Sequence, residues 1–235
     1  MLDHAQIMLR GLIMQTVFVL IADQVGSRDD VDRVAGALDG LTERFGPQYL
    51  LAPERTAGDE LQAITGDAAC ALESSLHLLR SAHWRVGIGV GAVRLPLPPS
   101  VRESSGTAFT SARAAVERAT TRSTRFTAVG SETLAERVHD WGALVDLLLT
   151  QRARWSAPGW ELHDLIDGGL TQGEAAAQLG ITPQAASKRA RAAGLRIDSD
   201  ARRALARLMT QVGATVEDPA ASPLAAEPTI DKGVS

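Results

Sequence analysis

The sequence predicts an α+β fold in which a βαββαβ domain precedes an all-α helix-turn-helix domain. Short β-branched and apolar runs alternate with stretches whose apolar residues recur every three or four positions. A Gly-Asp pair joins two of the strand-like runs as a hairpin turn would. Beyond these runs, the last third of the chain has mainly helical spacing.

The composition is that of an ordinary globular protein. The chain has 235 residues, of which 45% are hydrophobic and 22% are charged. Its formal net charge of -4 argues against a uniformly basic coat for nucleic acid, so charge has to be judged segment by segment. The single cysteine, Cys70, excludes an intramolecular disulfide and is expected to be a buried structural thiol in a reducing compartment. The five histidines have no paired ligand spacing, so no zinc site is expected.

The first apolar stretch, residues 11–22, has two interpretations. As the core of a signal peptide it follows Arg10, and it is too short to span a bilayer. As a strand buried on both faces it contains the continuous apolar run 17–21 and ends on Asp23. We favour a strand over residues 16–23, because the following segments continue a recognisable order. The protein is therefore expected in the cytoplasm, without membrane contact.

The elements after this strand follow from periodicity. Apolar residues at helical spacing predict a helix over residues 31–45, with its N-cap within residues 27–30. The next predicted elements are strands at 48–56 and 60–64, a helix from 67 to about 83, and a strand at 84–93. Alternating glycines in the last strand indicate that another element packs closely against it. This order is the split βαβ, or ferredoxin-like, arrangement, which places the first strand beside the hairpin.

The remaining chain is predicted to be mostly helical. We expect a helix over residues 107–121, a short strand over 126–129, a long helix beginning at Ser131 and a last helix from about residue 199 to 212. The resulting divisions are an α+β domain at 1–130, a helical connector at 131–156, a helix-turn-helix domain at 157–213 and a disordered tail at 214–235.

Two carboxylates are expected to meet at one end of the sheet. Asp23 ends the first strand and Asp59 lies in the hairpin turn, so the split βαβ order makes them near neighbours. Hard divalent cations prefer carboxylate oxygens, and the backbone of the turn at Gly26 and Ser27 could hold phosphate groups. The alternative is structural: Asp23 caps a helix, Asp59 closes a hairpin, and Arg55 pairs with a neighbouring glutamate, Glu54 or Glu60.

Four segments taken together resemble a known family. They are FVLIADQVGS at 18–27, RTAGDELQAI at 55–64, RVGIGVGAV at 85–93 and GTAFTSARAAVERA at 106–119. Their order and spacing resemble class III nucleotide cyclases and, more closely, the SatD family of bacterial proteins, whose cyclase-like domain is followed by a helix-turn-helix. Each motif alone is weak, and the resemblance depends on their order.

The resemblance implies a site for Mg²⁺ or Mn²⁺ with a nucleotide. Asp23 and Asp59 match the positions that bind metal, and Arg55 stands at the position that reads the base. Thr110 occupies the position of a transition-state asparagine, and the nearby arginine, Arg113, is one residue from its expected place. One residue turns a helical side chain by about 100°. The resemblance therefore implies nucleotide binding without turnover; the alternatives are an active cyclase or a ligand-free dimerisation scaffold.

The segment TQGEAAAQLGITPQAASKRARAAGL, residues 171–195, has the spacing of a helix-turn-helix. Ala176 stands where the two helices would touch, Gly180 at the turn, and Ala186 and Ala190 on the inner face of the second helix. Pro183 is compatible with the first turn of that helix, where its missing N–H costs nothing.

Positive charge is concentrated in and after this second helix, which favours double-stranded DNA as a partner. The residues expected to contact DNA are Thr182, Gln184, Ser187, Lys188, Arg189 and Arg191, with Gln184 and Arg191 at base edges and Lys188 and Arg189 at phosphates. A homodimer is expected, since such proteins usually read two half-sites. The alternative is an alanine-rich hairpin used only for dimerisation.

Overall fold

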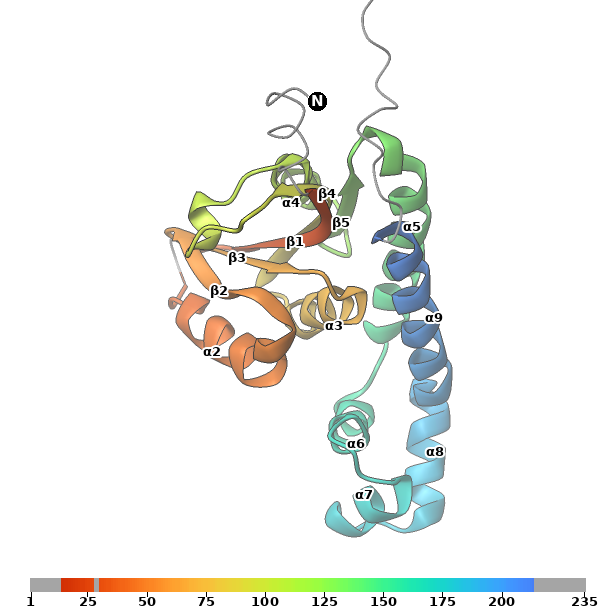
Figure 1. The fold of residues 1–235 in the computed structure, drawn as a ribbon. Coiled ribbons are helices and arrows are strands. Elements are labelled where there is room, and N and C mark those ends of the chain that lie inside the picture. Colours follow the sequence, from red (N-terminus) through yellow and green to blue (C-terminus); the bar gives the residue numbers. More distant parts are fainter. Residues whose placement is uncertain (1–13, 28–29, 214–235) are drawn as a thin grey trace, which may run out of the picture.

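The computed structural model describes residues 14–27 and 30–213, so the predicted tail at 214–235 lies outside the described residues. Within them the protein is an α+β structure with one five-stranded sheet and eight α-helices (Figure 1). The strands are β1 Met14–Gln24, β2 Tyr49–Ala57, β3 Glu60–Thr65, β4 Trp84–Arg94 and β5 Phe126–Gly130. The helices are α2 Val34–Phe45, α3 Ala68–Leu79, α4 Thr107–Ala119, α5 Ala135–Arg152, α6 Ala157–Asp167, α7 Gln172–Gln178, α8 Pro183–Ala193 and α9 Leu195–Gly213. Short 3-10 turns occupy Gly46–Gln48, Val101–Glu103 and Glu132–Leu134.

The sheet has the strand order β2-β3-β1-β4-β5. Neighbouring strands are antiparallel except β4 and β5, which are parallel, so the sheet is mixed. β1 lies between the β2–β3 hairpin and β4, as the predicted element order requires. The run of residues 17–21 that favoured a strand is buried within β1.

Helix α4 covers one face of the sheet and lies unusually close to β4 (Figure 1). A Cβ atom added to Gly89 would lie 2.1 Å from the Ala108 carbonyl oxygen and 2.2 Å from the Ala112 nitrogen. Gly87 and Gly91 face α4 in the same way. The alternating glycines therefore provide the close packing that the sequence predicted.

The opposite face carries the larger core. Phe18, Leu20, Val86, Ile88 and Val90 of the sheet pack with buried residues of α2, α3, α5 and α9. Helices α5 and α9 run side by side at the edge of the sheet (Figure 1). The C-terminal part of α9 thus belongs to the same core as the sheet. Among residues 14–27 and 30–213, no helix is both long and apolar enough to cross a membrane.

Helices α6, α7 and α8 form a small cluster at one end of the molecule (Figure 1). Its own core consists of Leu162, Ala175, Ala176 and Ala186, with partly buried aliphatic residues around it. Helix α6 has local start signals that were not predicted to begin a helix: Ser156 caps it and Pro158 lies in its first turn.

Four predicted helix boundaries are wrong. The first helix begins at Val34 with Arg33 at its N-cap, rather than at residue 31 with an N-cap within residues 27–30, and Val31 is 66% exposed. The buried side chain of Gln24 explains this difference, because it donates to the Val31 carbonyl at 2.8 Å and accepts from the Arg33 nitrogen at 2.9 Å. The second difference is that α3 ends at Leu79 rather than near residue 83, and the third that α9 begins at Leu195 rather than near residue 199. The fourth is that α5 begins at Ala135 rather than at Ser131, because a 3-10 turn precedes it.

Candidate functional site

The ends of β1 and β3 bring the two predicted carboxylates together. Asp23 lies opposite Glu60 in the β1–β3 register, and the backbone nitrogen of Gln24 donates to the Asp59 carbonyl at 3.0 Å. The hydroxyl of Ser27 donates a hydrogen bond to the Asp59 carboxylate. The predicted proximity of Asp23, Asp59 and Ser27 is therefore present in the fold.

The surroundings of Asp23 disfavour its charged form. Burial raises its pKa above the ordinary value of 3.8, and the neighbouring Asp59 carboxylate raises it further. Arg85 of β4 opposes this effect, donating to Asp23 at 3.0 Å. A cation between the two carboxylates would relieve the same repulsion.

Arg85 is a site residue that the sequence analysis missed. It lies directly opposite Asp23 in the antiparallel β1–β4 pairing, at the start of the glycine-rich strand. The motif RVGIGVGAV was recognised, but only the strand register places its arginine beside Asp23.

Arg113 of α4 points to a different carboxylate. It forms an ion pair with Glu60, whose Oε1 atom also accepts from Thr56 at 2.5 Å and from Gln62 at 3.0 Å. The exposed side chain of Thr110 donates to the carbonyl of Thr107 at 3.0 Å, within its own helix. Neither residue forms a hydrogen bond with Asp23 or Asp59 among the interactions of the described residues.

Arg55 lies at the outer edge of the site. Its guanidinium group donates to the Gly58 carbonyl at 2.8 Å and to the Asp32 carboxylate at 2.6 and 2.5 Å. The predicted alternative paired Arg55 with Glu54 or Glu60 and is wrong about the partner, which is Asp32. Gly26 is exposed with φ +70, a conformation that suits glycine in the turn after β1.

The carboxylates of Asp23 and Asp59 are oxygen ligands of the type that hard cations bind, and two of them leave further coordination positions for water or phosphate. Arg85 and Ser27 both bind Oδ2 atoms, of Asp23 and Asp59 respectively. The described part of the chain contains no group of three or more His, Cys, Asp or Glu side chains that could hold a metal ion. A cation here would therefore take two protein carboxylates and complete its coordination with water or phosphate oxygens.

The α7–α8 pair begins and ends with strong local signals. The Thr171 hydroxyl accepts from the Glu174 nitrogen at 3.2 Å, while the Glu174 carboxylate accepts from the Thr171 nitrogen at 2.8 Å. Gly180, with φ +64, makes the turn between the two helices. Thr182 caps α8 by accepting from the Ala185 nitrogen at 3.1 Å, and Gly194, with φ +66, ends it.

Helix α8 has one buried and one exposed side. Ala186 and Ala193 are buried, and Ala190 is half-buried. On the other side Gln184, Lys188 and Arg191 are exposed and Ser187 is half-buried. This is the orientation expected from the 3.6-residue period, although it does not test what the exposed side contacts.

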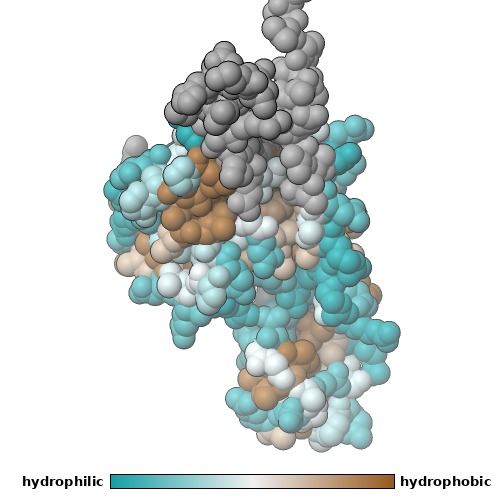
Figure 2. Space-filling view, viewed as in Figure 1, coloured by the Kyte–Doolittle hydropathy of each residue, from teal (hydrophilic) through white to brown (hydrophobic). Residues whose placement is uncertain are grey.

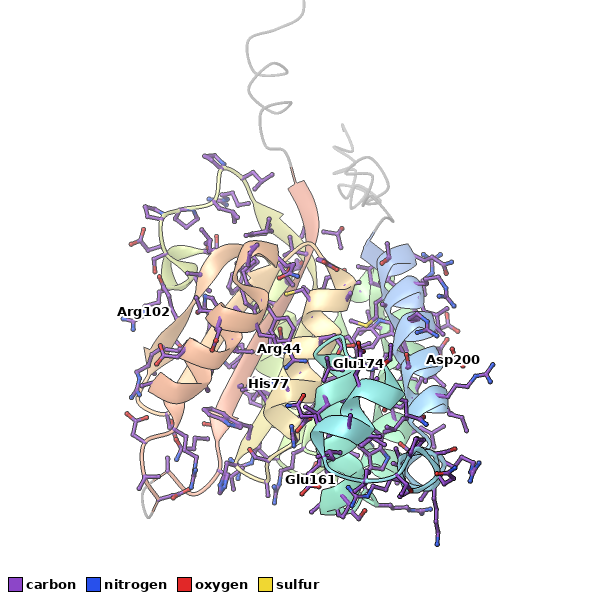
Figure 3. All side chains as sticks on the ribbon, turned by 90° about the horizontal axis from the view of Figure 1, so that it is seen from below. Arg44, His77, Arg102, Glu161, Glu174 and Asp200 are labelled. Atoms are coloured by element: carbon purple, nitrogen blue, oxygen red, sulfur yellow. The ribbon has the colours of Figure 1, made fainter. Side chains whose placement is uncertain are left out.

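Two other arginines of this region pair with carboxylates in different surroundings. Arg189, which is half-buried, lies 3.5 Å from the exposed Glu161 of α6, and water and salt weaken such a pair near the surface. Arg202 instead lies in a network with Glu73 of α3, Asp167 of α6 and Asp198 of α9. Its charge is compensated within the fold, so Arg202 is a structural residue. In Figure 3 the end that carries α6 to α8 faces the viewer, with Glu161 and Glu174 on that side of the molecule.

The visible surface of this end is mostly hydrophilic or neutral. Figure 2 shows only a small apolar area there, and a larger one on the part of the molecule that holds the sheet.

No family model matches the chain, and neither a curated protein nor a solved structure matches it.

Proposed function

We propose that the protein is a DNA-binding transcription regulator whose α+β domain binds a divalent metal ion with a nucleotide and does not turn the nucleotide over. The observation that carries the DNA-binding part is the face of α8: Gln184, Lys188 and Arg191 are exposed on a capped helix whose opposite side is buried. A regulator of this kind acts in the cytoplasm.

The motif order that resembles the SatD family supports the same combination of domains. In this proposal α7 and α8 are the helix-turn-helix, and α8 is the recognition helix. Asp23 and Asp59 hold Mg²⁺ or Mn²⁺, and the turn at Gly26 and Ser27 faces the phosphates. The partner of Arg113 supports the absence of turnover, because Glu60 holds the guanidinium group that would otherwise stabilise a transition state.

The DNA-binding proposal predicts a strong effect of charge on α8. We expect Lys188→Ala combined with Arg191→Ala to weaken DNA binding about 10- to 100-fold near physiological salt. The slope of log affinity against log salt should fall by up to about two units if both side chains neutralise phosphates, and by less if Arg191 reads a base. Fluorescence anisotropy on a selected site and on scrambled DNA measures both quantities.

The control is Arg94→Ala combined with Arg118→Ala, which removes the same charge from exposed positions on β4 and α4. Gln184→Ala should relax specificity at one base pair at a cost of about 1–3 kcal/mol. Equal binding by the folded α8 variant and the parent would overturn the assignment and favour the dimerisation hairpin.

The metal proposal predicts opposite effects of one substitution with and without the ion. Asp59→Asn keeps an oxygen that can accept from Ser27 but removes the negative charge that raises the pKa of Asp23. We therefore expect the metal-free variant to melt at or above the parent's temperature, while Mg²⁺ or Mn²⁺ stabilises only the parent. Because the pKa of Asp23 is raised, protons compete with the metal ion for Asp23 at a higher pH than they would at an ordinary aspartate. The stabilisation by Mg²⁺ or Mn²⁺ should therefore decline as the pH falls toward this raised pKa.

Thermal melting with and without the ions tests this prediction, with the exposed Asp39→Asn as the control. Equal absence of a metal response in the parent and in Asp59→Asn would leave the site as a turn. Calorimetric titration with ATP or GTP in the presence of Mg²⁺ tests nucleotide binding, and formation of a cyclic product would establish the active cyclase instead.

A further inference from the structure

The exposed large apolar side chains are concentrated on two helices. In the described residues these side chains are Val31, Leu50, Leu144, Leu147, Ile197 and Leu208. The last four belong to α5 and α9, and Leu147 and Ile197 are 66% and 73% exposed. An apolar cluster of this kind on a water-facing surface commonly marks an interaction site.

The four exposed apolar residues of α5 and α9 border one continuous groove between these helices. A hollow of about 410 Å³ is lined by Leu144, Leu147, Ile197 and Leu208, and a second of about 290 Å³ shares Leu144 and Leu208 with it. The α5–α9 groove is defined by these two hollows. It extends along about 15 residues of α5, or roughly 22 Å at the rise of an α-helix.

The two helices run in opposite directions along the groove. Asp140 of α5 lines the hollow at the end where α9 contributes Val212, and Gln151 lines the hollow at the end where α9 contributes Ile197. The N-terminal end of α5 therefore lies beside the C-terminal end of α9.

The rims of the groove carry charges of both signs. At the N-terminal end of α5, Glu136, Asp140 and Arg137 leave one net negative charge, and α9 has Arg207 at that end. At the other end α5 is followed by the exposed Arg154, and α9 has the exposed Asp200, which forms an ion pair with Arg203 of the same helix. Asp200 points outward from α9 (Figure 3). At the N-terminal end of α5 the groove thus has an acidic rim on α5 and the basic Arg207 on α9, whereas at the other end Arg154 follows α5 and α9 carries the Asp200–Arg203 pair.

We propose that the α5–α9 groove is the homodimer interface and that a second copy of this chain covers it. A patch that contacts itself across a two-fold axis must be self-complementary, and the apolar centre of this groove, with charges of both signs at its rims, meets that condition. The apolar centre and the charged rims match the anatomy of a protein interface.

Two symmetric arrangements satisfy the charges. With the axis parallel to the helices, α5 lies over the partner's α9, and Asp200 faces the partner's Arg154. With the axis across the helices, α9 lies over the partner's α9, and Asp200 faces the partner's Arg207. Only the parallel axis places both α6–α8 clusters at the same end, which two DNA half-sites require. The choice of the parallel axis therefore rests on the proposed function, whereas the interface itself does not.

The oligomeric state of the full chain tests the interface. We expect the parent to sediment as a dimer at micromolar concentration, and Leu147→Glu combined with Ile197→Glu to raise the dimer dissociation constant at least 100-fold. Both side chains are so exposed that the monomer should keep its fold, which circular dichroism verifies. The matched control, Val31→Glu combined with Leu50→Glu, adds the same charge at the other exposed apolar positions and should remain dimeric. A monomeric parent, or a groove variant that dimerises like the parent, would overturn the proposal.

Charge reversal distinguishes the two axes. In the proposed arrangement Arg154→Asp weakens the dimer and adding Asp200→Arg restores it, whereas Arg207→Asp is not restored by Asp200→Arg. The reverse pattern would reject the parallel axis. Fluorescence anisotropy with DNA separates the interface from the proposed function. A protein that dimerises through the groove but does not bind DNA would support the interface and overturn the proposed function. A protein that binds DNA but dimerises through another surface would support the proposed function and overturn the interface.

Discussion

Gly89→Ala is expected to destabilise the protein by about 3 kcal/mol or more, because the added methyl group meets backbone atoms that cannot rotate away. Its Cβ would lie 2.1 Å from the Ala108 oxygen and 2.2 Å from the Ala112 nitrogen. Relief requires α4 to move off the sheet, which would open the core between α4 and β4. The same movement would displace Arg113 from Glu60 at the edge of the candidate site.

Urea unfolding followed by circular dichroism measures this effect. The control is Gly36→Ala on α2, where an added Cβ has no atom within 4 Å. Alanine is the better helix former, so this control should stabilise the protein by roughly 0.5–1 kcal/mol. If Gly89→Ala unfolded at the parent's urea concentration, the close contact between α4 and β4 would be wrong.

The close packing of β4 could be predicted from its sequence, but the packing partner could not. Glycines at every second position of a strand remove the side chains from one face, which implies that something approaches that face. The helix that fills the space is identified only by the fold, where Ala108 and Ala112 of α4 meet Gly89.

The candidate site was predictable to the same limited extent. The adjacency of Asp23 and Asp59 followed from the element order, since the hairpin pairs with the first strand. The partners of these residues depend on register and on side-chain reach. Arg85 lies beside Asp23 because β1 and β4 pair in one particular alignment, and Arg113 binds Glu60 because α4 crosses the sheet at that point.

The predicted start of α2 was wrong because a distant side chain competes with the helix for its backbone groups. Periodicity placed Val31 on the apolar stripe of α2, but Gln24 from the end of β1 binds the backbone at Val31 and Arg33 and holds it outside the helix. The predicted place of Pro183 in the first turn of α8 is confirmed, since Thr182, Pro183 and Gly194 give local start and stop signals that need no distant partner.

The second large effect is expected at the ion pair between α5 and α9. Arg152 donates to both carboxylate oxygens of Asp198 at 2.6 and 2.7 Å, and the two side chains are 7% and 1% exposed. Asp198→Ala leaves a buried guanidinium group without its carboxylate, so we expect a loss of about 3–5 kcal/mol. Asp198 also accepts from Arg202, so part of this loss comes from the second arginine.

Replacing both partners should cost much less than replacing one. In Arg152→Met combined with Asp198→Leu, no charge of the pair remains buried, and Arg202 keeps Glu73 and Asp167. Urea unfolding of the parent, the two single variants and the double variant gives the coupling free energy, expected at about 2–3 kcal/mol. Single variants that each lose under about 1 kcal/mol would contradict the buried pair. Because Asp198 lies only five residues after Ala193, the last residue of α8, the pair also fixes where α8 lies relative to α5. If the proposed function is right, a folded double variant should therefore bind DNA more weakly than its stability alone explains, since its α8 helices would be held less firmly at the spacing of two half-sites.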